Sequence, residues 1–69
     1  MTTLEKAKII ATRDFLTGVL IAGRINRHSV IELVRAEGAR VEGLLYGVEP
    51  NYKLTEKGLA FLEQWKDLA

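Results

Sequence analysis

The sequence of 69 residues contains no cysteine, one proline (Pro50) and one histidine (His28). Without cysteine the chain can form neither a disulfide framework nor a thiolate metal site. The two aspartates, Asp14 and Asp67, lie near opposite ends, so with a single histidine there is no cluster of metal ligands to propose. A chain this short must be stabilised by its apolar core alone or with the help of a partner.

Catalytic motifs are also missing. His28 and Ser29 are the only histidine and the only serine, but sequence neighbours project in different directions from a helix. A nucleophile and its base must instead face each other. Glu32 and Glu37 are five residues apart and do not share a helix face, and no glycine-rich phosphate loop is present. We therefore expect no enzyme activity, no cofactor, no bound metal and no small-molecule substrate.

Long apolar runs are absent as well. The longest, from Phe15 to Gly23, is less than half the length needed to cross a bilayer, and it directly follows Arg13 and Asp14. Acidic residues at positions 5 and 14 also break the pattern of a secretory signal peptide. The sequence therefore predicts a cytoplasmic protein that does not enter the membrane.

Neither sign of charge is in large excess. Ten basic residues oppose nine acidic ones, for a net charge of +1 at pH 7, which is unlike a strong non-specific nucleic-acid binder. Apolar residues make up 48% of the chain, more than a small monomer readily hides. This excess favours a homodimer or an apolar binding face.

What the sequence does contain is a set of helix starts and apolar stripes. Thr2 stands three residues before Glu5, the spacing of a capping box, and predicts a first helix there. Two apolar faces follow at steps of three and four, one of Leu4, Ala7, Ala11, Phe15 and Val19, the other of Ile9, Leu16 and Leu20. The second face indicates either a helix enclosed in the core or a dimer interface, and we expect a homodimer to form through this helix or the closing one.

The sequence does not decide where the first helix ends. Thr17 and Gly18 can break it, and residues 19–22 can then form a strand or a second short helix. The next segment, NRHSVIELVRAEG at residues 26–38, is the clearest helix. Ser29 lies three residues before Glu32, and this spacing predicts Ser29 as the N-cap of the helix, with Asn26 as an alternative.

We expect this second helix to bury Val30, Leu33 and Val34, with Ile31 and Ala36 beside them, and to close at Gly38. Residues 39–46 then alternate as a strand does, GVEPN supplies a turn, and residues 52–54 return as a second strand. Thr55 is expected to cap a closing helix that buries Phe61, Leu62, Trp65 and Leu68. The predicted order is helix, uncertain segment, helix, hairpin and helix, in one α+β domain covering residues 1–69.

The stretch SVIELVRAEGARVEGLLYGVEPNYKLTEKGLAFLEQW, residues 29–65, resembles the second half of a winged-helix domain. The shared features are a recognition-type helix ending in glycine, a strand, a short wing, and the aromatic-x-Leu-Thr-x-x-Gly run that starts the closing helix. In this pattern Tyr52 and Leu54 point into the core, and Gly58 lets the closing helix approach its neighbours closely.

The first half is shorter than in that family. Either a second helix is compressed into residues 17–25, or the fold is an abbreviated relative. In its abbreviated form the pattern resembles small early proteins of phages, some of which use a winged-helix-like scaffold to bind host transcription machinery rather than DNA.

All five arginines lie between residues 13 and 40, and arginine suits bidentate contacts with guanine, phosphate or carboxylate. The resemblance implies a DNA-reading surface on helix 27–38 and the hairpin. On that surface base edges would meet Arg27, His28 and Ile31, phosphates would meet Arg24, Arg40 and Lys53, and Arg35 would project from the later helical turns. The other interpretation is a solvated face, partly neutralised by the three glutamates at positions 32, 37 and 42.

Two functions therefore stay open. The first is a small winged-helix transcription regulator that binds duplex DNA as a homodimer. The second is a phage-type inhibitor that uses the same scaffold to occlude a host transcription regulator or another host protein. An inhibitor should expose an apolar patch, and we expect it on the hairpin at Leu44, Tyr46 and Val48.

Overall fold

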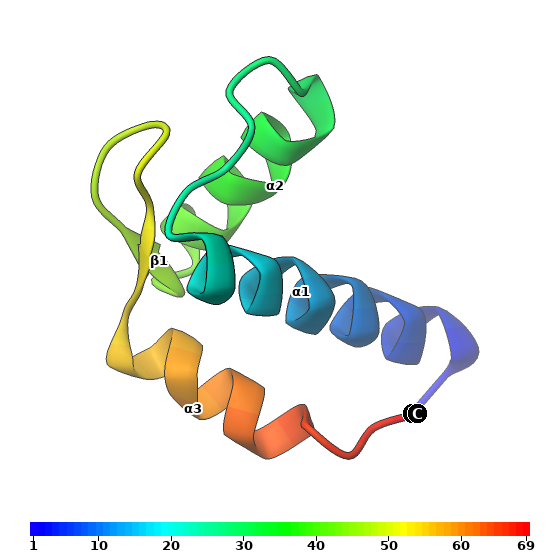
Figure 1. Ribbon diagram of the computed structural model, residues 1–69. Coiled ribbons are helices and arrows are strands. Elements are labelled where there is room, and N and C mark those ends of the chain that lie inside the picture. The colour runs from blue at the N-terminus through cyan, green and yellow to red at the C-terminus, as the bar shows by residue number, and fades with distance from the viewer.

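The computed structural model describes residues 1–69 and contains three helices and one antiparallel hairpin. The elements are, in order, α1 (Thr3–Ala22), α2 (Val30–Val41), β1 (Leu45–Tyr46), β2 (Lys53–Leu54) and α3 (Glu56–Trp65). Helix α1 lies between the other two helices, and the hairpin packs near its C-terminal end (Figure 1). The chain is therefore a small α+β domain, as the sequence predicts.

The helices begin at the predicted capping residues. The hydroxyl of Thr2 accepts a hydrogen bond from the backbone N–H of Glu5 at 3.1 Å, and the hydroxyl of Ser29 accepts one from the N–H of Glu32 at 3.3 Å. Thr55 caps α3 in the same way, with a bond of 3.0 Å. Each bond satisfies one of the N–H groups that a helix start leaves without a partner inside the helix.

Helix α1 is uninterrupted, which decides the question that the sequence left open: the chain does not break at Thr17 and Gly18, and residues 19–22 form neither a strand nor a separate helix. The helix ends instead at Gly23, which has the left-handed conformation (φ 73°) and donates its N–H to the carbonyl oxygen of Val19 at 2.8 Å. Leu16 is fully buried, so it belongs to the core and not to a second, outward face.

Helix α2 continues past the predicted stop at Gly38 and ends at Val41. Gly43 is the residue that takes the left-handed conformation (φ 80°) and turns the chain. Its N–H and that of the next residue both donate back to carbonyl oxygens in the last turn of α2, a common way to close a helix. The predicted strand over residues 39–46 is therefore wrong except at Leu45–Tyr46.

Small side chains, and not valines, form the buried side of α2. Ala36 and Ala39 are buried, whereas Val30 and Val34 are 72% and 66% exposed, which contradicts the predicted stripe. Alanine allows a helix to lie close to its neighbours, and this orientation turns the β-branched side chains toward solvent. Leu33 stays partly buried against the core.

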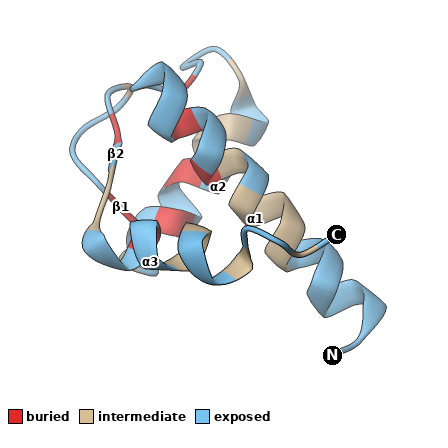
Figure 2. Cartoon of the chain, turned by 60° about the horizontal axis from the view of Figure 1, so that its bottom comes forward, coloured by how far each residue is buried: buried red, intermediate tan, exposed pale blue.

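One hydrophobic core joins the helices and the hairpin (Figure 2). Its buried residues are Leu16, Val19, Ile25, Ala36, Ala39, Leu44, Leu45 and Tyr52. Helix α3 adds the partly buried Phe61 and Leu62, and Leu54 packs against the same core. Tyr52 and Leu54 thus point inward, as predicted. The first turns of α1 project away from the core with exposed side chains (Figure 2).

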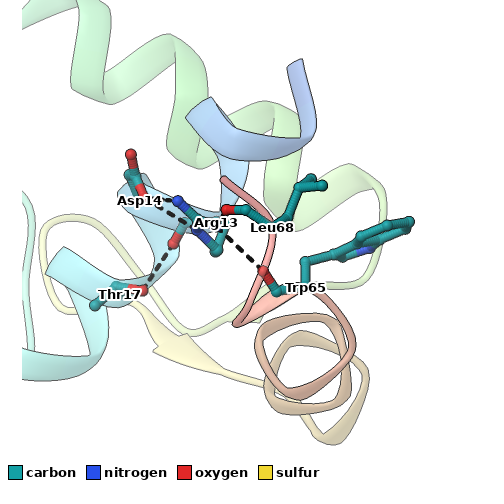
Figure 3. Close-up of polar contacts among 5 residues, drawn as sticks. All are labelled: Arg13, Asp14, Thr17, Trp65 and Leu68. Atoms are coloured by element: carbon teal, nitrogen blue, oxygen red, sulfur yellow. Dashed lines mark hydrogen bonds and ion pairs between the residues drawn. The ribbon is translucent and has the colours of Figure 1, made fainter. Parts of the chain in front are cut away.

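Arg13 joins α1 to the C-terminal end of α3 (Figure 3). Its Nη1 donates to the carbonyl oxygen of Trp65 at 3.2 Å and also to that of Leu68, while Nε and Nη2 bind the carboxylate of Asp14 at 3.1 Å. A positive charge is favoured at the C-terminal end of a helix, where carbonyl groups lack partners. Arg13 therefore caps α3 from a different helix.

Candidate binding surfaces

The seven residues predicted for the DNA-reading surface are all exposed, and they come from a loop, α2 and the hairpin. They fall into separate groups: Arg24, Arg27 and His28 on the loop before α2, Ile31 and Arg35 on α2, Arg40 at its end, and Lys53 on β2. The loop group is the only one in which several of the predicted basic side chains share a hollow.

The loop of residues 23–29 is anchored by a buried side chain. Ile25 is only 4% exposed, and its N–H donates to the carbonyl oxygen of Pro50 in the hairpin loop at 2.9 Å. Asn26 shapes the next turn, because its side-chain oxygen accepts from the N–H of His28 at 3.0 Å. Asn26 was predicted as an alternative helix cap, and Ile25 was not predicted to be a core residue.

Arg24, Arg27 and His28 line a hollow of about 670 Å³ beside this anchored loop. Glu32, in the first turn of α2, lines the same hollow and brings an opposite charge. The group could contact an anion such as a phosphate, but its positive charge is partly offset by this carboxylate.

Arg40 is already paired within the chain. Its Nε donates to both carboxylate oxygens of Glu37, at 3.1 and 3.2 Å, and Nη2 binds the same group. The hydrogen bond from Arg40 holds the pKa of Glu37 below its usual value of 4.5, and the pair is exposed to solvent. An external phosphate would have to compete with this carboxylate.

An apolar groove lies where the end of α1, the hairpin and the start of α3 meet. We call it the hairpin groove; its volume is about 280 Å³, and it is lined by Val19, Leu20, Gly23, Tyr46, Tyr52, Lys53, Leu54 and Leu59. Leu20, Tyr46 and Leu59 form its rim and are 52%, 52% and 47% exposed. Lys53 is its only charged residue and makes no ion pair within the chain.

The apolar patch predicted on the hairpin is present only in part. Tyr46 lies in the hairpin groove, and Val48 is 77% exposed outside it. Leu44, in contrast, is 3% exposed and cannot belong to a surface. The turn at Gly43 directs the chain inward here, so that Leu44 enters the core before the hairpin begins.

A second apolar surface covers the outward side of α2. We call it the α2 face; it consists of Val30, Ile31, Val34 and Val41, with exposed fractions of 72%, 66%, 66% and 75%. This surface was not predicted from the sequence, because Val30 and Val34 were assigned to the core. Ala36 and Ala39, which share the other side of the helix, were the available signal.

No three histidine, aspartate or glutamate side chains lie close enough together to hold a metal ion. None of the helices combines the length and the apolar character that a bilayer crossing requires.

Comparison of the chain with protein families, curated proteins and solved structures finds no match. Three surfaces of the chain can bind another molecule: the basic loop formed by Arg24, Arg27 and His28, the hairpin groove, and the α2 face.

Proposed function

We propose that this protein is a small protein-binding regulator whose hairpin groove holds an apolar segment of a partner protein. The observation that carries the proposal is the groove itself, in which the half-exposed rim of Leu20, Tyr46 and Leu59 surrounds a buried apolar floor. Hollowed apolar surfaces of this kind are typical of interaction sites, and an aromatic side chain at the rim suits a binding hot spot.

The size and charge of the groove define the occupant. A volume of about 280 Å³ is near the lower limit for ligand pockets, which suits one or two apolar side chains of a peptide segment. Lys53 has no carboxylate partner in its own chain and stands at the groove. The partner segment should therefore carry an apolar anchor next to an aspartate or glutamate.

We also propose that the scaffold is an abbreviated winged helix that acts in transcription control by occluding another protein. The order of α2, hairpin and α3, with Thr55 as the cap, supports this assignment. The resemblance to phage proteins that bind host transcription machinery supports the inhibitor over a DNA reader. A scaffold of this class does not by itself require DNA binding.

Duplex DNA is the second candidate ligand, and the basic loop favours it. Arg24, Arg27 and His28 share one hollow at the start of α2, where they could meet phosphates. This candidate ranks second because the outward side of α2 is apolar. A helix that recognises DNA sequence needs polar side chains that form hydrogen bonds with the base edges. The net charge of +1 also provides little attraction for a polyanion.

Selection from a random peptide library on the immobilised full-length protein tests the proposal. We expect the enriched peptides to share an apolar residue next to an acidic one. Their binding should be lost in Leu59→Ser, which changes the rim, and kept in Val48→Ser, which changes an exposed apolar residue outside the groove. Peptides that bind both variants as well as the wild type would contradict the assignment. Salt-sensitive retention of a duplex, lost in Arg27→Ala, would favour the second candidate.

A further inference from the structure

Gly38 lies on the exposed side of α2, and nothing in its own chain requires a glycine there. The helix runs straight through it without a left-handed turn, and an added β-carbon would meet no atom within 4 Å. Glycine weakens the interior of a helix relative to alanine. A close approach by another molecule is a physical reason to have glycine at such a position.

The residues around Gly38 have the pattern of a helix-pairing surface. Val34 precedes it by four residues and Val41 follows it by three, so the three positions line one side of α2. Val30 and Ile31 extend the same side toward the start of the helix. These spacings are those through which two helices pack against each other.

The exposed area of the chain is also larger than its mass predicts. The surface measures 4853 Å², roughly 500 Å² above the value expected for a folded monomer of 7.7 kDa. A standard interface buries about 800 Å² on each partner. A single pair of helices would remove less than that, which predicts weak association in the micromolar range.

Two charged residues identify the occupant of the α2 face. Arg35 and Glu42 stand on the same flank of α2, on either side of Gly38, and the three residues line one hollow beside α1. Neither charge has an ion-pair partner within the chain. When a twofold axis relates two antiparallel helices, this flank of one helix lies next to the same flank of the other. Arg35 of one copy then faces Glu42 of the other, and the reverse pair forms by symmetry.

We propose that the α2 face binds a second copy of this chain, with the two α2 helices antiparallel and crossing at Gly38. The midpoint between Arg35 and Glu42 falls beside Gly38, so the charges and the glycine define the same crossing point. Val34 of each copy packs near Val41 of the other. The homodimer predicted from the sequence thus forms through α2, and not through α1 or α3. None of the hairpin-groove residues takes part, so this inference is independent of the proposed function.

Sedimentation equilibrium of the full chain from about 10 µM to about 1 mM tests the inference. The wild type should pass from monomer to dimer over this range. Arg35→Glu and Glu42→Arg should each weaken association by about tenfold or more, because like charges then meet across the interface. An equimolar mixture of the two variants should regain association, since each new charge then faces an opposite one. A wild type that stays monomeric, or a mixture that associates no better than its components, would overturn the inference.

Gly38→Ala supplies a second test that does not depend on charge. The added methyl group has open space in the monomer, so the variant should fold at least as stably as the wild type but associate about tenfold more weakly. Gly18→Ala is the matched control, because Gly18 lies inside α1 with equally open surroundings and away from the α2 face. Equal association by both variants would contradict a crossing at Gly38.

Discussion

The carbonyl oxygen of Leu44 lies too close to Gly58 for a β-carbon to fit there without a shift of the backbone. The same oxygen accepts a hydrogen bond from the N–H of Thr55 at 3.1 Å, which fixes it against the start of α3. The first turn of α3 therefore packs directly against the backbone of Leu44, the residue before the hairpin. Only glycine allows this approach.

Gly58→Ala should lower the free energy of unfolding by about 1 to 3 kcal/mol, because the methyl group has to displace backbone and not a flexible side chain. Urea denaturation measures the loss. Gly18→Ala, made in open space on α1, should instead raise the free energy by about 0.5 to 1 kcal/mol. Similar effects for the two substitutions would refute the close approach of α3.

Arg13→Ala should destabilise the chain by about 1 to 3 kcal/mol, because two main-chain carbonyl groups at the end of α3 lose a charged donor. Hydrogen exchange should speed up in the last turn of α3. Asp14→Asn is the control: it removes only a surface ion pair, which is worth less than about 1 kcal/mol. An equal loss in both variants would show that the pair, and not the cap, stabilises this end.

Stability should fall at alkaline pH through Tyr52. Burial raises the pKa of Tyr52 above its usual value of 10.0, with the nearby carboxylates of Glu37 and Glu49 adding to the effect. The folded chain then holds this proton more tightly than the unfolded chain. The contribution to stability is complete below about pH 10 and is lost as pH rises through the raised pKa.

Urea denaturation between pH 8 and pH 11 or so checks this dependence. Tyr52→Phe should remove the part of the alkaline loss that comes from this phenol, whereas Tyr46→Phe, at an exposed tyrosine, should leave the loss as it is in the wild type. If both variants lose stability in parallel with the wild type, the titration of Tyr52 does not control alkaline unfolding.

The local signals of the sequence predicted the starts of the three helices and one core residue of the hairpin correctly. Thr2, Ser29 and Thr55 cap the three helices, and Tyr52 enters the core at the predicted place. These features depend on interactions within a few residues, or on one large side chain with few alternatives. They could therefore be read without knowledge of the tertiary structure.

The orientation of α2 could not be predicted in the same way. The helical spacing of the apolar residues assigned Val30 and Val34 to the core, but Ala36 and Ala39 are the residues that close packing buries. The choice between Gly38 and Gly43 as the helix end also depended on tertiary structure, because Leu44 has to reach the core after the turn. The α2 face and the inward position of Leu44 both follow from this packing.

The candidate site was predicted least completely. Tyr46 was identified as an apolar surface residue, but its neighbours in the hairpin groove, Leu20 and Leu59, come from helices distant in sequence. The basic residues were identified individually, yet arginine positions alone could not show that Arg40 pairs with Glu37. Which exposed residues share one binding surface depends on the tertiary structure, and the sequence alone does not show it.

An NMR titration of the ¹⁵N-labelled protein tests the central claim most directly. One sample receives a synthetic peptide with the selected apolar and acidic motif, and a second receives a short DNA duplex at low salt. We predict that the peptide shifts the backbone signals of Leu20, Tyr46 and Leu59, and that the duplex leaves them unchanged. Shifts confined to Arg24, Arg27 and His28 with the duplex, and none in the groove with the peptide, would contradict the proposed function.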